Sequence, residues 1–362
     1  TDYHERFKQF LVYLQDYNLV TIGGMTDVKG DRSKKANQQR DPDLFVHVVA
    51  EREDGIVVRG AKAHLTGVSG AHELMVFPTE NMKEDAKDYA VVFSCPVNTP
   101  GITYIFGRQT NDGRKLDTEH PIDQGNFKYA CVGGECIAVF DDVFIPWKDV
   151  YMYKEYEFAG MFVEAFATAH RQNYGACKGG IADVLLGATY GICKVNGVER
   201  VGHVRDKMAD MINLTETLYA GSVACSYEGR PTPSGAGRAD TMLANITKHN
   251  TTKFVYEIDR IAHDLVGGLL ATLPAEADLR NPEIGPLIER YLAGNESMCT
   301  EDKIRLYRLV ETLSGGTAVV ESMHGAGSPQ SQRIMMLRDA KLEEKLKLAQ
   351  KLVDCEGACC GQ

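Results

Sequence analysis

The feature that most constrains the fold is a change of hydrophobic period near residue 153. Before it, between about residues 20 and 150, short β-branched apolar runs alternate with clusters of Gly, Pro, Asn and Asp. This pattern is typical of an all-β barrel or sandwich. After it, apolar residues recur at helical spacing over long segments, as in the helices of a bundle. We therefore predict an α+β chain with a β-domain over residues 20–152 and a helical bundle over residues 153–362.

The same spacing predicts the individual elements. Apolar side chains at helical intervals indicate an amphipathic helix over residues 2–17. Strands are expected at the apolar runs 56–58, 74–77, 90–93, 103–106 and 137–140. Helices are expected over 181–195, 203–228, 240–270, 283–294, 301–320 and 331–354, with Gly and Pro between them.

Composition narrows the class of protein. With 362 residues, 44% of them hydrophobic, the chain is long enough for two or three domains and a large core. Its formal charge of −10 argues against nucleic acid as the main partner. We find neither an apolar run long enough to cross a membrane nor a secretory signal. Because the chain opens at Thr1 without a methionine, we expect a processed or truncated product.

The ten cysteines do not suggest a disulfide scaffold in a chain of this length. Most stand singly in apolar surroundings, as Cys193 and Cys225 do, and are expected to be buried thiols. A reducing, cytoplasmic location follows as the simpler interpretation. Cys355, Cys359 and Cys360 form a group at the C-terminus that could ligate a metal, although a frayed terminus is a poor place for a rigid site.

One segment concentrates chemically active side chains: His170-Arg-Gln-Asn-Tyr174-Gly-Ala-Cys177-Lys178. The apolar spacing just before it predicts a helix. If that helix continues, the four numbered residues fall at i, i+4, i+7 and i+8, which is one face. Two metal-capable side chains, a proton donor and a cation would then share one stripe. Core helices rarely need that set, because buried polar groups are costly unless they are paired.

Two segments of the predicted β-domain could contact an anionic cofactor. The polar loop from Met25 to Arg32 has backbone amides, with Lys29 and Arg32, that could hold a pyrophosphate; the alternative is a solvated loop. The segment 60–67 follows a predicted strand, and the hydroxyl and amide of Thr66 could face the N5 and carbonyl edge of a flavin ring. The alternative there is a polar turn that ends the strand.

Two further segments carry candidate acid–base groups. Glu135 enters an apolar strand, and it is either a surface residue at the strand end or partly buried with a raised pKa that suits acid–base work. Residues 321–330 form a Gly-rich break between two predicted helices and carry Glu, His and Gln side chains. The lack of bulk at Gly325 and Gly327 would let a ligand approach the backbone, or the segment is only an interhelical loop.

Together these segments resemble the 4-hydroxybutyryl-CoA dehydratases, which are also vinylacetyl-CoA Δ-isomerases. That family is related to the 4-hydroxyphenylacetate 3-monooxygenases and has an acyl-CoA dehydrogenase-like fold. The His-x6-Cys-Lys segment separates the dehydratases from the monooxygenases. The matching stretches follow the family's order over essentially the whole chain and are 25–32, 54–64, 157–161, 170–178 and 321–330.

The resemblance implies a site. Active-site positions of the family match His170, Tyr174, Lys178, Glu135 and Glu321. Two ligands of a [4Fe-4S] cluster match His170 and Cys177. The flavin would be FAD, and the residues that the resemblance assigns to cofactor binding are Met25, Thr26, Asp27, Lys29, Arg32, Lys62, His64, Thr66, Gly325 and Gly327.

The resemblance also implies a reaction and an assembly. The expected reaction is dehydration of 4-hydroxybutyryl-CoA to crotonyl-CoA by a radical mechanism, with the flavin as one-electron acceptor and the cluster as Lewis acid. The expected assembly is a homotetramer that binds an acyl-CoA. The alternatives are a flavin-dependent aromatic monooxygenase of the 4-hydroxyphenylacetate 3-hydroxylase type and a relative without flavin or enzymatic activity.

One departure from the family concerns the cluster ligands. In the family, a Cys-x-x-x-Cys pair in an N-terminal helical domain supplies the other two ligands, and residues 1–19 match the end of that domain. The chain therefore supplies two of the four expected ligands. Either the chain is a fragment, or the N-terminal part is a separate chain, or the cluster is lost.

Overall fold

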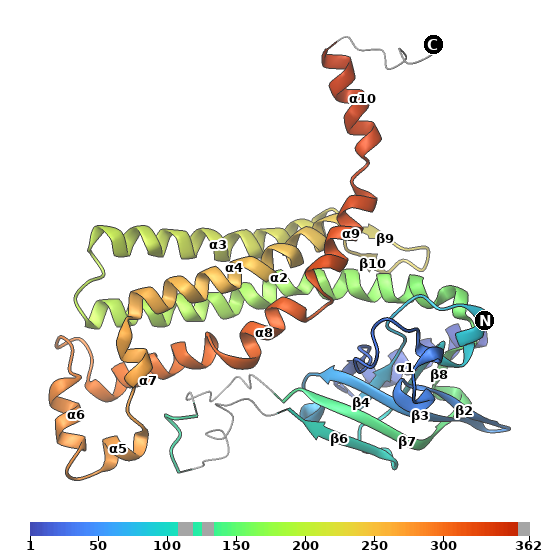
Figure 1. Cartoon of the computed structure of the whole chain (residues 1–362), viewed down its shortest axis with the longest axis horizontal. Helices are drawn as coiled ribbons and strands as arrows, with labels where there is room; N and C mark the ends of the chain where they lie inside the picture. Colours follow the sequence, from blue (N-terminus) through green and yellow to red (C-terminus); the bar gives the residue numbers. More distant parts are fainter. Residues whose placement is uncertain (108–118, 125–133, 354–362) are drawn as a thin grey trace. The chain divides into compact units, whose positions relative to one another are not determined.

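The computed structural model describes residues 1–107, 119–124 and 134–353 (Figure 1). Their contacts group into two compact units, and the boundary between the units falls after Phe166, inside the long helix α2 (Tyr156–Val195). The first unit therefore contains both four-stranded sheets and the start of α2. The second contains the rest of α2, all later helices and the short segment 119–124.

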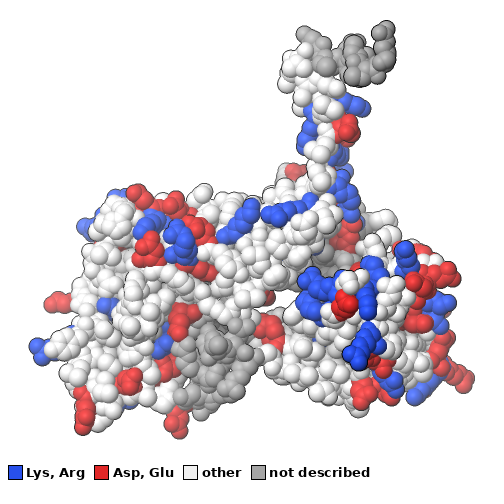
Figure 2. Space-filling view, in the orientation of Figure 1, with Lys and Arg blue, Asp and Glu red and all other residues white. Residues whose placement is uncertain are grey.

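Charged side chains of both signs lie on the visible face of each unit (Figure 2). Figure 2 shows Lys and Arg interspersed with Asp and Glu on each of them. Among the helices that the structure describes, none combines the length and apolar character needed to cross a membrane. Cys355, Cys359 and Cys360 lie outside the described residues.

Two four-stranded sheets form the first unit. One has the order β1-β4-β5-β8 and the other β2-β3-β7-β6. Neighbouring strands are antiparallel except for β1 and β4, which are parallel. All five predicted strand positions are confirmed. The strands are β1 (Thr21–Gly24), β2 (His47–Arg52), β3 (Gly55–Leu65), β4 (Glu73–Val76), β5 (Val91–Pro96), β6 (Ile102–Phe106), β7 (Cys136–Pro146) and β8 (Val150–Tyr153).

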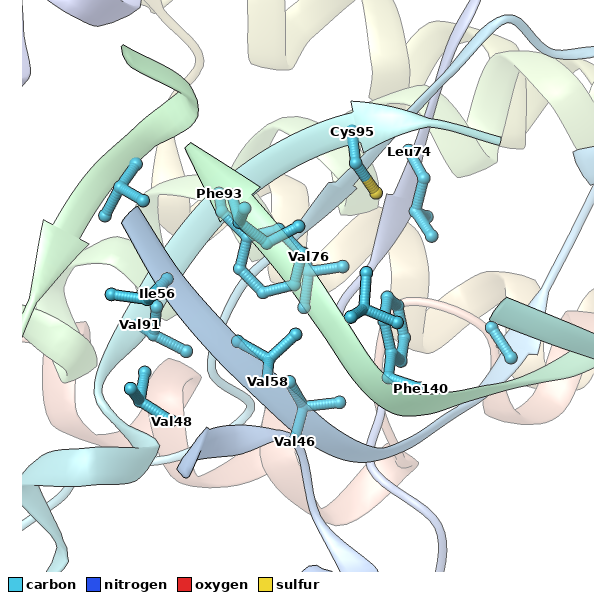
Figure 3. Close-up of a cluster of buried hydrophobic side chains, with 14 of the residues drawn as sticks. Val46, Val48, Ile56, Val58, Leu74, Val76, Val91, Phe93, Cys95 and Phe140 are labelled. Carbon is cyan, nitrogen blue, oxygen red and sulfur yellow. The ribbon is translucent and has the colours of Figure 1, made fainter. Parts of the chain in front are cut away.

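The two sheets share one apolar core. Val58 and Phe140 from one sheet belong to the same buried cluster as Val76 and Phe93 from the other (Figure 3). Burying one such side chain stabilises the fold by about 1.5–3 kcal/mol relative to leaving it exposed. Because the described strands remain in two separate sheets, the barrel that the sequence left open is wrong, and the shared core fits the sandwich alternative.

Helical segments pack on a second cluster of the same unit. The helix predicted over residues 2–17 is α1 (Asp2–Asp16), and the Thr1 hydroxyl caps it by accepting from the His4 amide. Phe10 of α1 belongs to a buried cluster with Phe77 and Val92, against which Phe162 of α2 also packs.

Three long helices run side by side in the second unit (Figure 1). They are the second part of α2, α3 (Gly202–Tyr227) and α4 (Thr241–Val266). Their close approach requires a glycine at position 175, because a Cβ there would overlap the Thr247 side chain of α4 and the Leu218 carbonyl oxygen of α3. The remaining elements are the hairpin β9 (Arg230–Pro231) and β10 (Gly237–Arg238), α5 (Glu276–Arg280), α6 (Gly285–Tyr291), α7 (Thr300–Leu313), α8 (Gly316–His324), α9 (Pro329–Asp339) and α10 (Leu342–Leu352).

The predicted helical segments are confirmed, but several predicted helix ends are wrong. The helix predicted over 301–320 is broken into α7 and α8 at Ser314 and Gly315, where Gly316 takes a left-handed φ of 59°. The helix predicted over 331–354 is broken at Lys341, whose φ is 48°. A residue with left-handed backbone angles interrupts the hydrogen bonding of a right-handed helix, even where the apolar residues keep their helical spacing. The segment predicted over 283–294 shortens to α6.

Candidate active site

Helix α2 carries the predicted stripe without interruption, which confirms the helix expected before and through residues 170–178. The exposure of the four side chains differs. Tyr174 and Lys178 are buried at 5% and 3% exposure, His170 is half-buried and Cys177 is exposed. The His170 and Tyr174 rings lie 5.2 Å apart between centroids. The predicted stripe therefore combines a buried phenol and a buried ammonium with a thiol at the surface of the second unit.

Lys178 forms the ion pair at the centre of the site. Its Nζ donates to Glu321 Oε2 at 2.6 Å, across 143 residues of sequence. Lys178 Nζ also lies 5.7 Å from the centroid of the Tyr174 ring. Glu321 belongs to the last turns of α8 rather than to the break predicted over 321–330, which starts only after His324. Two residues that the sequence placed on separate segments are thus in direct contact.

The two glycines of this break have different roles. Gly325 lies against Tyr174, so that a Cβ at position 325 would overlap the phenol oxygen. Its φ of −59° is ordinary, and the constraint is therefore one of space. Gly327 takes a φ of 94°, which disfavours any other residue, and a Cβ there would crowd the Arg171 guanidinium.

Arg171 anchors the break to the helices, a role that the sequence did not reveal. Its buried guanidinium donates to the Ala326 carbonyl oxygen at 2.9 Å, to Asn245 Oδ1 at 2.7 Å and to Ser331 Oγ at 3.0 Å. These partners come from the break itself, from α4 and from α9. Arg171 therefore fixes the backbone next to the two glycines.

Lys248 is a second residue that the sequence did not single out. Its side chain on α4 is fully buried, and Nζ lies 4.8 Å from the centroid of the Tyr174 ring. Burial, together with the positive charges of Arg171 and Lys178, lowers the pKa of Lys248 to about 7. A signal was present in the sequence, because Lys248 interrupts the inward stripe of α4 between Ala244 and Thr251.

A small cavity is lined by both Lys178 and Asp259. The sequence did not indicate Asp259 as a site residue. Asp259 is 6% exposed, and its Oδ2 has no hydrogen-bond partner among the described residues. Burial raises the pKa of Asp259 to about 7, although the Lys178 charge opposes the shift. The Lys178 ammonium therefore has carboxyl groups on two of its neighbouring helices, α4 and α8.

His170 and Cys177, the two residues predicted to bind a metal cluster, could supply two of its four ligands. Burial lowers the pKa of His170 to about 4, so the imidazole is neutral near pH 7, as a metal ligand must be. The exposed Cys177 thiol is accessible to a metal. Within the described ranges no three His, Cys, Asp or Glu side chains come close enough to hold a metal ion. A four-ligand cluster therefore needs donors beyond these two.

The predicted flavin loop is clamped by a buried ion pair in the first unit. Lys62, 2% exposed on β3, donates through Nζ to Asp27 Oδ1 at 2.5 Å and to the Met25 carbonyl oxygen at 3.0 Å. Thr79, which the sequence did not single out, accepts from the Asp27 amide at 3.1 Å and donates to the same Met25 oxygen. The Thr26 carbonyl oxygen accepts from the Ala63 amide at 2.7 Å. Lys62 and Asp27 thus hold the loop in place.

The end of β3 presents Thr66 as the sequence predicted, at a strand-to-loop junction. The pairing of β3 with β7 shifts register between Lys62 and Leu65, and His64 takes a left-handed φ of 60°. Such bulges redirect the side chains that follow. Thr66 and His64 are exposed at this position, as are Lys29 and Arg32 of the loop. The exposed groups are those that a cofactor could contact.

Glu135 lies directly before β7, half-buried, between the two alternatives that the sequence left open. Its carbonyl oxygen accepts from the Gly107 amide at 2.8 Å. Its carboxylate contributes to the raised pKa of Cys136, which burial mainly causes. Glu135 therefore belongs to the first unit, whereas Tyr174, Lys178 and Glu321 belong to the second.

An open cavity of about 570 Å³ lies beside the predicted flavin loop. Its lining combines cationic and anionic side chains with the backbone of the loop end. The residues that line it are Gly30, Asp31, Lys34, Gln39, Arg40, Asp41, Pro42 and Leu44. A polar or charged part of a ligand could enter it, since both basic and acidic groups face the opening.

Two family profiles together match most of the chain. The 4-hydroxyphenylacetate 3-hydroxylase N-terminal profile matches residues 1–152, and the C-terminal profile matches residues 159–354. The chain belongs to the 4-hydroxyphenylacetate 3-hydroxylase family. The boundary between the two matches falls close to residue 153, where the hydrophobic period of the sequence changes.

Within this family, the similarity to dehydratases is high. The chain is 45% identical, over 97% of its length and 74% of the relative's, to the 4-hydroxybutyryl-CoA dehydratase/vinylacetyl-CoA-Δ-isomerase of Clostridium aminobutyricum. It also matches the structure of an oxygen-tolerant archaeal 4-hydroxybutyryl-CoA dehydratase from N. maritimus, with a TM-score of 0.96 and 46% identity over 100% of this chain and 72% of that one. The resemblance predicted from the segments is confirmed.

More distant structures share the fold alone. The oxygenase component of 4-hydroxyphenylacetate 3-monooxygenase, complexed with FAD and 4-hydroxyphenylacetate, has a TM-score of 0.85 at 24% identity, over 97% of this chain and 74% of that one. Glutaryl-coenzyme A dehydrogenase has a TM-score of 0.57 at 14% identity, over 92% of this chain and 69% of that one. The predicted mixed fold with likeness to acyl-CoA dehydrogenases is therefore confirmed at this coarse level.

Proposed function

We propose that this chain dehydrates 4-hydroxybutyryl-CoA to crotonyl-CoA and isomerises vinylacetyl-CoA to the same product. The observation that carries the proposal is the position of Lys178 on α2: it pairs with Glu321 of α8 and lies beside the Tyr174 ring, on the same helix that presents His170 and Cys177. The high identity to a named dehydratase/isomerase supports it. The 4-hydroxyphenylacetate oxygenases are more distant, which favours the dehydratase over the aromatic monooxygenase.

FAD and a [4Fe-4S] cluster are the cofactors of this proposal. Thr66 and the loop 25–32 would hold the flavin, and His170 and Cys177 would supply two of the cluster ligands. When bound, the flavin would supply one-electron oxidation of the substrate and the cluster would supply Lewis acidity toward the leaving hydroxyl. We further propose that the two remaining ligands come from a preceding segment of the protein or from another chain, in a homotetramer.

The chain's own side chains would handle protons. Tyr174 is a buried phenol with the Lys178 ammonium beside its ring, so it can donate a proton to a developing anion and be stabilised after the loss. Lys178 holds the Glu321 carboxylate in place through an ion pair at 2.6 Å, and this position would suit a group that accepts a proton or a hydrogen bond from the substrate hydroxyl. Glu135, half-buried at the start of β7, is the second candidate base.

The reaction itself tests the proposal. Protein purified without oxygen would be given 4-hydroxybutyryl-CoA or vinylacetyl-CoA under anoxic conditions, or 4-hydroxyphenylacetate with reduced flavin and added dioxygen, and products would be separated by chromatography. Crotonyl-CoA from both thioesters is the expected result. Hydroxylation of the phenol without any crotonyl-CoA would instead establish the aromatic monooxygenase.

Metal analysis tests the cluster separately. Iron and acid-labile sulfide would be measured in the wild type and in His170→Ala and Cys177→Ala. Loss of iron in both variants is expected, whereas Cys299→Ala, which removes another exposed thiol of the second unit, should retain it. Full flavin with no iron in the wild-type protein, isolated together with any preceding segment, would refute the cluster and the dehydratase assignment with it.

A further inference from the structure

Lys248 is a buried cation with an unusual set of neighbours. Its side chain is 0% exposed, and among the described residues it forms no ion pair with a carboxylate. An ammonium removed from water in this way is costly unless other groups compensate for the lost hydration. Its partners among these residues are two backbone oxygens and one aromatic ring. Lys248 is therefore not an ordinary surface charge, and its buried position needs a structural explanation.

The backbone oxygens belong to the end of α8. Lys248 Nζ donates to the Ser322 carbonyl oxygen at 2.7 Å and, more weakly, to that of Met323 at 3.4 Å. The last carbonyl groups of a helix have no partner within it, and α8 ends at His324. A cation at this end also interacts favourably with the helix dipole. Lys248 thus secures the turn that immediately follows Glu321.

The ring belongs to Tyr174, whose centroid lies 4.8 Å from Lys248 Nζ. A cation within about 6 Å of a ring centroid is attracted to the ring face, and more strongly so when both are desolvated. Tyr174 is 5% exposed, so this condition is met. One ammonium on α4 therefore contacts both the phenol on α2 and the turn of α8 that carries Glu321.

We propose that Lys248 is a positioning residue that fixes Tyr174 and Glu321 relative to each other. Lys178 joins Glu321 by its side chain, whereas Lys248 holds the backbone beside Glu321 and the ring of Tyr174. This role builds on the proposed function, in which Tyr174 and Glu321 handle protons. The ordering of the Tyr174 ring, however, can be measured whether or not that function is correct.

The test places 3-fluorotyrosine at position 174 in the full-length protein and records its ¹⁹F NMR signal. Wild type and Lys253→Met, a control on the exposed side of the same helix, should give the same single resonance. Lys248→Met, which keeps the side-chain length without the charge, should shift and broaden it. An unchanged resonance in a folded Lys248→Met protein would overturn the proposal.

Kinetics then separate the positioning role from the reaction. In Lys248→Met, kcat should fall by about 10- to 100-fold while KM for the acyl-CoA changes less than about threefold, as expected when the reacting groups are misplaced but binding is kept. A Lys248-dependent resonance in a protein that makes no crotonyl-CoA would uphold the positioning role and reject the proposed function. A perturbed resonance with unchanged kcat would reject the catalytic importance of Lys248.

A complementary experiment applies if Lys248→Met does not fold. Amine-reactive labelling of Lys248 would be quantified by mass spectrometry in the wild type and in Tyr174→Leu. Because the ring covers the ammonium, labelling at Lys248 should rise by about tenfold in the variant, while labelling at Lys253 stays constant. Equal labelling of Lys248 in both proteins would overturn the contact.

Discussion

Gly325 and Tyr174 are in such close contact that a methyl group on the glycine would occupy the position of the phenol oxygen. The glycine is therefore required by space and not by its backbone conformation, since its φ is −59°. This contact joins the break after α8 to the stripe on α2. It means that the position of the Tyr174 hydroxyl depends on a residue 151 positions later in the sequence.

Gly325→Ala should destabilise the protein by about 1–3 kcal/mol, the usual cost of overpacking, and reduce crotonyl-CoA formation more strongly because Tyr174 must move. Denaturant unfolding and turnover would be measured together. Tyr174→Phe removes the clashing oxygen, so the double variant should recover part of the lost stability. Gly180→Ala, an exposed helical site where the added methyl group meets nothing, is the control and should be neutral or stabilising. A fully stable Gly325→Ala would contradict the packing described here.

Glu321→Gln should leave the buried Lys178 ammonium without its charged partner and cost about 2–3 kcal/mol of unfolding free energy, less than for a fully buried pair because Glu321 is partly exposed. The double variant Lys178→Met/Glu321→Gln should be more stable than Glu321→Gln alone, since no charge is then stranded. Glu5→Gln, which breaks the exposed pair with Lys8, should change stability by under about 0.5 kcal/mol. Purely additive losses in the Lys178 and Glu321 variants would argue against the coupling.

Asp259 should make stability depend on pH. Because burial raises the pKa of Asp259 to about 7 in the folded protein, the folded state holds a proton that the unfolded chain releases near pH 4. Its contribution is fully present below pH 4 and is lost as pH rises through about 7, with a slope of up to about 1.4 kcal/mol per pH unit. Unfolding midpoints between pH 5 and pH 7 should therefore fall in the wild type and flatten in Asp259→Asn. The exposed Asp210→Asn should keep the wild-type slope; a wild-type slope in Asp259→Asn would be the contrary result.

Thr79→Val should weaken flavin binding without removing any group that faces the cofactor. The hydroxyl of Thr79 joins the Asp27 amide and the Met25 carbonyl oxygen, and both bonds are lost in valine. Losing them should raise the Kd for FAD by about 5- to 30-fold, which corresponds to about 1–2 kcal/mol. Titration followed by flavin fluorescence would measure this. Thr99→Val, at an exposed turn of the same unit, should bind FAD as the wild type does; equal Kd values for all three proteins would show that the loop does not hold the flavin.

The sequence by itself determined the local features of this protein. Alternation and helical spacing depend only on neighbouring residues, so the five strand positions, the α2 stripe and the junction at Thr66 could be predicted. The end of α7 and the start of α10 could not be predicted, because the left-handed backbone at Gly316 and Lys341 leaves the apolar spacing unchanged. Segment similarity identified the family, since short motifs keep their order over the whole chain.

The tertiary structure alone decided which side chains share the site. Glu321 meets Lys178 across 143 residues, and Lys248 reaches Tyr174 from α4. Asp259 and Arg171 acquire their environments in the same way, from helices that approach at Gly175. Such contacts depend on how closely two helices pack and on which residues of the partner helix lie opposite, and the spacing within one helix specifies neither. The sequence therefore supplied the chemical groups on α2, and the packing of α4 and α8 against them supplied their partners.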